Sequence, residues 1–308
     1  MKNSRIYDDE IRSFSLQSCA DTQAFIETEE AHFTARLEEI ARYLHSRKEL
    51  RVLLLCGPSC AGKTTTSHRL VQAYEKTGGV MHSVSFDDFY LDRAQMEQRG
   101  TVNYETAQAL DLDTLARCLS DMMTCRTVQL PTFDFVSGKR AGYRVCRPQP
   151  GDLFVLEGIQ GFYPEVRALM ERTHWSGVFI SPGAVQCCQI KTDGNTLRLV
   201  RRIVRDVRAR GFDAQKTLHV WESVRTNEEK HIFPLADMYA DIHINSAFAY
   251  ELLVTVPLLR DALADTEFTE ARCADQAQTL LHRFDGLPQL PRSVVPPHSV
   301  LREFVGES

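Results

Sequence analysis

The sequence predicts an α/β fold in three layers, with a mainly parallel central sheet covered by helices on both faces. Short apolar runs alternate along the chain with amphipathic segments whose apolar residues recur at helical spacing. Strands that alternate with helices need crossover connections, and these connections produce a parallel sheet. The chain has 308 residues, of which 43% are hydrophobic and 25% charged, so its composition is that of an ordinary globular protein.

The expected elements follow in order along the chain. Apolar residues at helical spacing from Phe33 to Leu44 predict a helix that leads into the first strand. Further helices are expected from Thr64, from about Asp111 and, as a long helix, from about Asn195. The predicted strands cover residues 51–56, 82–86, 152–158, 177–181 and 241–245. The proline-rich end is expected to wrap the surface rather than to pack as regular structure.

The chain is expected to form one domain, because no internal linker divides it. We assign residues 1–32 to an N-terminal extension and residues 33–308 to the domain. The formal net charge of -5 argues against bulk affinity for nucleic acid or an anionic membrane. Apolar runs are far shorter than the roughly 20 residues of a membrane-spanning helix, and the start lacks the apolar core of a signal peptide. These features predict a soluble, cytoplasmic protein with no nucleic-acid or membrane partner.

The segment "CGPSCAGKTT" contains the pattern G-x-x-x-x-G-K-[ST] directly after an apolar run. In this pattern backbone amides surround phosphate oxygens, lysine neutralises them and the threonine hydroxyl coordinates Mg²⁺. The pattern predicts a P-loop NTPase fold that binds ATP and Mg²⁺. The residues expected to contact the nucleotide are Gly57, Ser59, Cys60, Ala61, Gly62, Lys63, Thr64 and Thr65. The thiol of Cys60 is expected to be either reactive beside Lys63 or covered by the fold.

Acidic residues end two of the predicted strands. Asp87 and Asp88 follow the second strand, and a carboxylate there can accept the proton of a substrate hydroxyl during phosphoryl transfer. The same pair would also fit helix capping. Glu157 ends the strand "DLFVLEG", where an acidic residue can hold Mg²⁺ beside the P-loop.

Arginines concentrate on one face of the long helix "NTLRLVRRIVRDVRARG". Residues turn by about 100° along a helix, so the arginines at 198, 201, 202, 205 and 208 fall within a sector of roughly 120°. A solvated face would be the ordinary explanation for a lone arginine. This density in an acidic protein favours contact with phosphate, as in lids that neutralise a transferring phosphoryl group.

Taken together, these motifs resemble the uridine kinase and phosphoribulokinase group of P-loop kinases, and most closely the bacterial uridine kinase-like proteins. The resemblance runs from about residue 33 to the end. It rests on "GPSCAGKTT", "SFDDFYLDR", "ALDLDTL", "LPTFDFVSGKR", "VLEGIQGFY", "LRLVRRIVRDVRARG", "EEKHIFPLADMYADIHINSAFAYEL" and "SVLREFVGES". Those relatives carry a threonyl-tRNA-synthetase-like region ahead of the kinase part, and the 32 residues ahead of the first matching helix are too few to hold it.

The resemblance implies transfer of the ATP γ-phosphate to a sugar hydroxyl, with a lid and a substrate hairpin around the site. Asp87 would be the base, and Thr64 and Glu157 would hold Mg²⁺. Lys63, Arg202 and Arg205 would assist transfer, and Arg210 would contact the nucleotide. The acceptor would lie near Tyr90, Gln108, Phe133, Phe135, Arg140 and Arg201.

The departures from the family pattern lie at the acceptor end. Gly138 stands where uridine kinases carry a base-reading histidine, and Gln108 stands where they carry an aspartate for the ribose hydroxyls. The acceptor is therefore expected to be a nucleoside-like or other sugar-containing molecule rather than uridine by default. A non-catalytic nucleotide-binding regulator is the alternative, and a nucleic-acid-directed ATPase comes third. Kinases of the group that the chain resembles commonly assemble, so the resemblance also makes a homo-oligomer possible.

Overall fold

A five-stranded parallel sheet forms the centre of the molecule in the computed structural model, which describes residues 11–14, 22–100 and 103–307. The strands lie in the order β10-β7-β2-β6-β3, and every neighbouring pair is parallel. Their bounds are Val52–Cys56 for β2, Met81–Ser85 for β3, Leu153–Gly158 for β6, Trp175–Ser181 for β7 and Ile242–Asn245 for β10. All five predicted strands are confirmed, and their ends lie within two residues of the expected positions.

Two separate hydrophobic cores cover the two faces of this sheet. Successive residues of β2 alternate between them: Leu53 and Leu55 belong to one core, and Val52 and Leu54 belong to the other. Both sets are buried, which is the pattern of a strand covered on both faces. The predicted three-layer arrangement is therefore confirmed.

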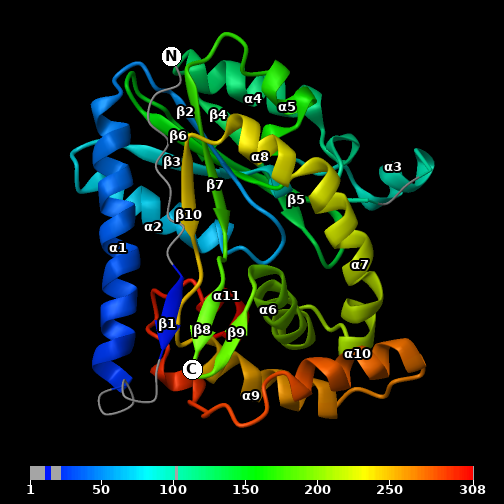
Figure 1. The fold of residues 1–308 in the computed structure, drawn as a ribbon. Helices are drawn as coiled ribbons and strands as arrows, with labels where there is room; N and C mark the ends of the chain where they lie inside the picture. Colours follow the sequence, from blue (N-terminus) through cyan, green and yellow to red (C-terminus); the bar gives the residue numbers. More distant parts are fainter. Residues whose placement is uncertain (1–10, 15–21, 101–102, 308) are drawn as a thin grey trace.

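The helices form the outer layers, with α1 and α2 on one face of the sheet and α4, α5 and α8 on the other, whereas α6 and α9 pack together beyond the carboxyl ends of the strands (Figure 1). The longer helices are α1 (Thr22–Ser46), α2 (Lys63–Glu75), α4 (Leu112–Met123), α6 (Gly194–Ala209), α7 (Ala214–His231), α9 (Glu251–Ala264) and α10 (Ala271–His282). The shorter helices are α3 (Arg93–Gln98), α5 (Pro164–Ala168), α8 (Phe233–Tyr239) and α11 (Arg302–Val305). Asp111 and Asp193 cap the starts of α4 and α6 by accepting the backbone N–H of the third helical residue.

Two smaller sheets accompany the central one. Strands β4 (Val128–Asp134) and β5 (Lys139–Cys146) form an antiparallel hairpin, as the resemblance implied for the substrate side. Strands β1 (Arg12–Phe14), β8 (Val185–Cys187) and β9 (Ile190–Thr192) form a three-stranded sheet that the sequence did not predict. None of these three strands exceeds three residues, which is too short for a clear alternation of apolar and polar side chains.

Two expectations about the ends of the chain need correction. Helix α1 begins at Thr22 rather than at Phe33, and it crosses the boundary expected after residue 32; residues 1–10 and 15–21 of the expected extension lie outside the described part. The proline-rich end does not stay on the surface. Val300, Leu301, Phe304 and Val305 are buried in the same core as α2 and α6, and residues 302–305 form α11.

Candidate active site

The P-loop connects β2 to α2 at the carboxyl edge of the sheet. Two of its glycines are required by close packing: a Cβ on Gly57 would lie 2.2 Å from the carbonyl oxygen of Ile180, and a Cβ on Gly62 would lie 2.2 Å from Val300 Cγ1. Gly62 also has a φ of 85°, in the left-handed region that favours glycine. The loop is thereby fixed in a curve that ends at the amino terminus of a 13-residue helix, where backbone N–H groups attract phosphate.

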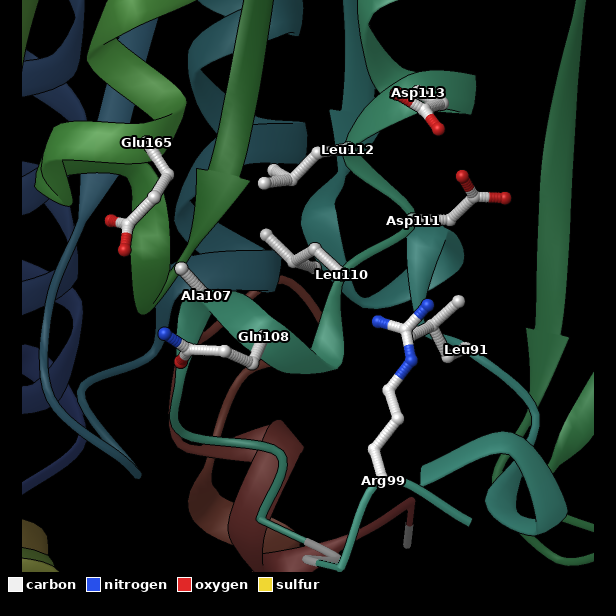
Figure 2. Close-up of a pocket in the computed structure, with 9 residues that line it drawn as sticks. All are labelled: Leu91, Arg99, Ala107, Gln108, Leu110, Asp111, Leu112, Asp113 and Glu165. Atoms are coloured by element: carbon white, nitrogen blue, oxygen red, sulfur yellow. The ribbon is translucent and has the colours of Figure 1, made fainter. Parts of the chain in front are cut away.

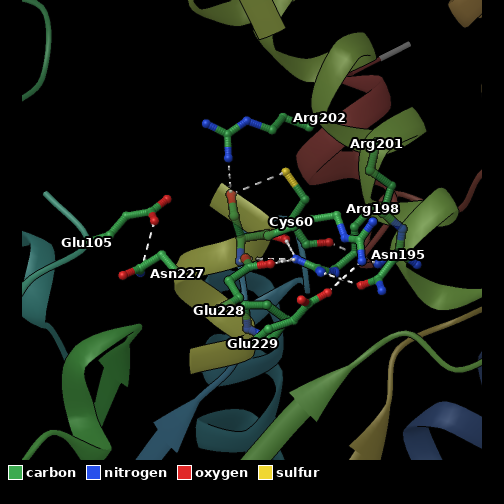
Figure 3. Close-up of polar contacts among 12 residues, drawn as sticks. Cys60, Glu105, Asn195, Arg198, Arg201, Arg202, Asn227, Glu228 and Glu229 are labelled. Carbon is green, nitrogen blue, oxygen red and sulfur yellow. Dashed lines mark hydrogen bonds and ion pairs between the residues drawn. The ribbon is translucent and has the colours of Figure 1, made fainter. Parts of the chain in front are cut away.

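A buried ion pair between Arg198 of α6 and Glu228 of α7 holds the P-loop in place. Glu228 of α7 accepts the Ser59 backbone N–H at 2.8 Å and both of its oxygens accept from Arg198 Nη1 at 2.8 Å. Arg198 also donates to the Ser59 carbonyl, at 3.2 Å. Figure 3 shows Glu228 and Arg198 at the centre of these contacts. The pair therefore bonds both sides of one loop residue, which sets the position of Ser59 before a nucleotide arrives.

The arginine face of α6 is divided into two groups. Arg198 and Arg201 are fully buried, and each is neutralised by a glutamate of this chain. Arg201 bonds both oxygens of Glu251 and donates to the Cys60 carbonyl at 3.3 Å. In this part of the helix face the arginines are therefore neutralised by glutamate side chains and not by a bound phosphate. Arg201 is used in holding the P-loop and does not reach toward an acceptor.

The second group carries excess positive charge beside the loop. Arg202, Arg205 and Arg210 all lie within 3.8 Å of the single buried carboxylate of Asp206. Arg202 also donates to the Ser59 hydroxyl at 3.1 Å (Figure 3). Burial and the charge of Arg205 lower the pKa of Arg210. Three guanidiniums that share one carboxylate leave a surplus of positive charge, which suits an incoming phosphate group.

A hydroxyl and a carboxylate fit the role predicted for Mg²⁺. Thr64 Oγ1 donates to Glu157 Oε1 at 3.2 Å, and Glu157 is buried at the end of β6. Burial, followed by the negative charge of Asp87, raises the pKa of Glu157 to about 7, although Lys63 opposes the shift. A buried carboxylate held beside a second one is a site that a cation would stabilise, and oxygen donors are what Mg²⁺ prefers.

The two aspartates after β3 have different surroundings. Asp88 Oδ1 accepts the backbone N–H of Phe133 at 3.2 Å, so it fastens the β4–β5 hairpin. Asp87 instead lies close enough to Glu157 and Tyr90 for its charge to raise the pKa of both. Of the pair, Asp87 is therefore the carboxylate that faces the P-loop side, whereas Asp88 has a structural contact.

Aromatic side chains cluster around Tyr90, which lies close to Asp87. The rings of Tyr90, Tyr104, Phe133 and Phe135 are neighbours, with centroid separations from 4.9 to 6.3 Å. Tyr90 is buried and its hydroxyl donates to the Tyr104 carbonyl at 3.0 Å. Phe135 is 54% exposed at the tip of the hairpin. This cluster presents an apolar and partly open face, of the kind on which a flat ring can stack.

Of the residues expected at the acceptor, Gln108 lies elsewhere and Arg140 is held in an ion pair. Gln108 is exposed and lines a separate hollow of about 250 Å³ with Asp111 and Glu165 (Figure 2). Arg140 donates to Asp111 at 3.1 Å, so its charge is used in an ion pair with the start of α4. The ribose contact expected of Gln108 therefore has no support from its position. Gly138 occupies the hairpin turn with a φ of 66°, a conformation that favours glycine.

Glu105 is a site residue that the motifs did not single out. It accepts a hydrogen bond from Asn227 at 3.1 Å, and Figure 3 shows the pair beside the P-loop group. Burial, followed by the charge of Glu228, raises the pKa of Glu105 to about 6, while Arg202 and Lys63 lower it. In the sequence, the only indication of a role for Glu105 was that an acidic residue stands three positions before Gln108 in the same segment.

The remaining loop residues lie at the start of α2 and in the turn that leads into it. Lys63 begins α2, and its Nζ donates to the Pro58 carbonyl at 3.0 Å. Ala61 is fully buried, and Cys60 is 3% exposed, so the fold covers the thiol. Cys60 has a φ of 60°. Of the two alternatives for Cys60, its burial favours the covered one.

The comparisons agree with this arrangement. Residues 52–249, more than half of the chain, match the model of the phosphoribulokinase / uridine kinase family. The chain therefore belongs to this family of P-loop kinases, which confirms the resemblance. It is 29% identical over 224 residues to a protein named uridine kinase from Ligilactobacillus salivarius (strain UCC118), a match that covers 70% of this chain and 95% of that protein.

Further relatives give the same result. A protein named uridine kinase from Limosilactobacillus reuteri (strain DSM 20016) is 28% identical over 238 residues, which covers 74% of this chain and 99% of that protein. Among solved structures, a "putative fructose transport system kinase" from Silicibacter sp. TM1040 superposes with a TM-score of 0.51 at 16% identity, covering 68% of this chain and 98% of that one. This likeness bears on the fold alone. No helix in the described ranges is long and apolar enough to cross a membrane.

Proposed function

We propose that this protein transfers the γ-phosphate of ATP to a hydroxyl of a nucleoside-like or other sugar-containing molecule. The supporting observation is the grouping of Lys63, Thr64, Glu157 and Asp87 at the carboxyl edge of three neighbouring strands. This edge is where parallel α/β sheets gather their ligands. A P-loop with a second carboxylate beside the metal-binding one has what phosphoryl transfer requires.

Asp87 is the base in this proposal. It takes the proton of the acceptor hydroxyl as that oxygen forms a bond to the γ-phosphorus, while the bond from the γ-phosphorus to the bridging oxygen breaks and ADP leaves. Lys63 and the first-turn amides of α2 hold the phosphates. Thr64 and Glu157 would hold Mg²⁺, which would offset the phosphate charge.

The remaining groups orient the acceptor and balance the charge. Arg202, Arg205 and Arg210 face the loop with one carboxylate between them, so they stabilise the negative charge that develops on transfer. The aromatic cluster of Tyr90, Tyr104, Phe133 and Phe135 packs against the acceptor. The carboxylate of Glu105, in place of the Gln108 amide expected there, accepts hydrogen bonds from the acceptor's hydroxyls.

A panel assay tests this function. ADP formation is measured with Mg²⁺ and ATP against nucleosides, pentoses, sugar phosphates and polyols. One acceptor class should stimulate ADP formation well above the rate with water alone, and Glu105→Gln should raise the KM for that acceptor while leaving the KM for ATP unchanged. Gln108→Ala is the matched control and should change neither. If ATP binds but no acceptor stimulates turnover, a nucleotide-binding regulator replaces the kinase.

A further inference from the structure

The carboxyl-terminal segment forms one wall of the P-loop. Val300 packs against Gly62, since a Cβ added to that glycine would lie 2.2 Å from Val300 Cγ1. The ring of Phe304 lies 4.9 Å from the guanidinium of Arg201, the residue that holds the Cys60 carbonyl. Residues 300–305 are thus packed between the start of α2 and α6, and in Figure 1 α11 lies beside α6.

One side chain of this segment bonds the nucleotide-binding turn. Thr65 Oγ1 donates to Glu303 Oε2 at 3.3 Å. Hydroxyl–carboxylate hydrogen bonds are usually nearer 2.7 Å, so this is a weak contact that another acceptor can displace. The charge of Glu303 also acts on its surroundings, because it raises the pKa of Glu157 and of Arg205.

This contact is in conflict with phosphate binding. Thr65 lies in the first turn of α2, where backbone amides and the helix dipole attract phosphate. Its hydroxyl has one proton, which it cannot donate to Glu303 and to a phosphate oxygen at the same time. A carboxylate at this place also repels the phosphates. Arg205 offsets this charge only in part, since it is already hydrogen-bonded to Asp206.

We propose that Glu303 weakens nucleotide binding by competing with phosphate for the Thr65 hydroxyl and by opposing its charge, and that it thereby promotes release of ADP. The inference rests on the proposed function, because it assumes that the P-loop of this chain binds ATP and ADP. It makes Glu303 a positioning residue that acts through Thr65. It also gives the buried chain end a role in turnover.

The test compares ADP affinity in the full chain by isothermal titration calorimetry with Mg²⁺. Glu303→Gln should lower the Kd for ADP roughly threefold to tenfold, because an amide oxygen is a weaker acceptor and carries no charge. The KM for ATP should fall as well, whereas the KM for the acceptor should not. Glu307→Gln removes an exposed carboxylate from the same segment and should leave the Kd unchanged.

Two further variants separate the contributions. Glu303→Asp keeps the charge but is one methylene shorter, so it should release Thr65 and lower the Kd by a smaller factor. In a Thr65→Val background, Glu303→Gln should have less effect, because the hydroxyl for which they compete is gone. An ADP Kd that is unchanged or higher in both Glu303→Gln and Glu303→Asp overturns the inference. If the unaltered protein binds neither ADP nor ATP, the proposed function fails instead.

Discussion

Removal of the Glu228 charge should destabilise the protein strongly, because it leaves Arg198 as an unpaired buried charge. Both side chains are 1% exposed. Breaking a buried ion pair by altering one partner costs about 3 kcal/mol or more, since the remaining charge keeps its desolvation penalty. We therefore expect Glu228→Gln to lower the free energy of unfolding, measured by urea denaturation, by about 3 kcal/mol.

The neighbouring residue provides a matched control. Glu229 pairs with Arg225 on the surface, where both side chains are more than 40% exposed, and such pairs contribute about 1 kcal/mol or less. Glu229→Gln should therefore change stability little. A loss in Glu228→Gln that is no larger than in Glu229→Gln would refute the reasoning.

A double variant separates stability from loop geometry. Replacing Arg198 by Met and Glu228 by Leu removes both buried charges, so most of the lost stability should return. ATP affinity of the double variant should nevertheless be lower than that of the unaltered protein, because the Ser59 N–H has lost the acceptor that it bonds at 2.8 Å. An ATP affinity of the double variant equal to that of the unaltered protein would show that the pair does not position the loop.

Four further predictions concern the site. Glu157 has a pKa of about 7, so its ionised fraction should rise roughly tenfold from pH 6 to pH 8. The affinity for Mg²⁺ with ATP should rise with it. In Glu157→Gln the measured Kd should no longer change in this way with pH. Because the pKa of Glu157 is higher in the folded than in the unfolded protein, its carboxyl group favours the folded state below about pH 4.5 and loses that contribution as the pH rises to 7. In Glu157→Gln the free energy of unfolding should therefore fall less between about pH 4.5 and pH 7. Phe133→Ala should raise the acceptor KM roughly tenfold and leave the KM for ATP unchanged, since one stacked ring contributes about 1–3 kcal/mol, and equal increases in both constants would argue against a stacking role. Cys60, at 3% exposure, should react with iodoacetamide far more slowly than the half-exposed Cys125, and mass mapping that finds the reverse order would contradict a covered thiol.

Regular elements of the sheet and its helices were predictable because their signals are local. β2 is apolar at every position between an amphipathic helix and a glycine-rich turn, and α6 carries a clear apolar stripe. The arginine face of α6 could be predicted from local sequence, but the partners of its arginines could not. Its density was plain in the sequence, but the partners of Arg198 and Arg201 are Glu228 and Glu251, which lie 30 and 50 residues away.

The chain end and the acceptor side could not be predicted for related reasons. The proline-rich composition of the end indicates irregular backbone, but it does not say whether that backbone is buried, and Val300 and Phe304 are. Matching by motif put Gln108 at the acceptor, whereas the turn at Ala107–Ala109 places it on the outside and leaves Glu105 beside the loop. A difference of three residues changes the face on which a side chain lies.

The most direct test of the central claim compares Asp87→Asn with Asp88→Asn. The account predicts that Asp87→Asn lowers ADP formation with the best acceptor by a hundredfold or more, about the contribution of a general base, while the Kd for ATP stays within threefold of its original value. Asp88→Asn keeps an oxygen that can accept the Phe133 N–H, so it should retain most of the turnover. If Asp87→Asn turns over like the unaltered protein, or if only Asp88→Asn is inactive, Asp87 is not the base and the proposed mechanism is wrong.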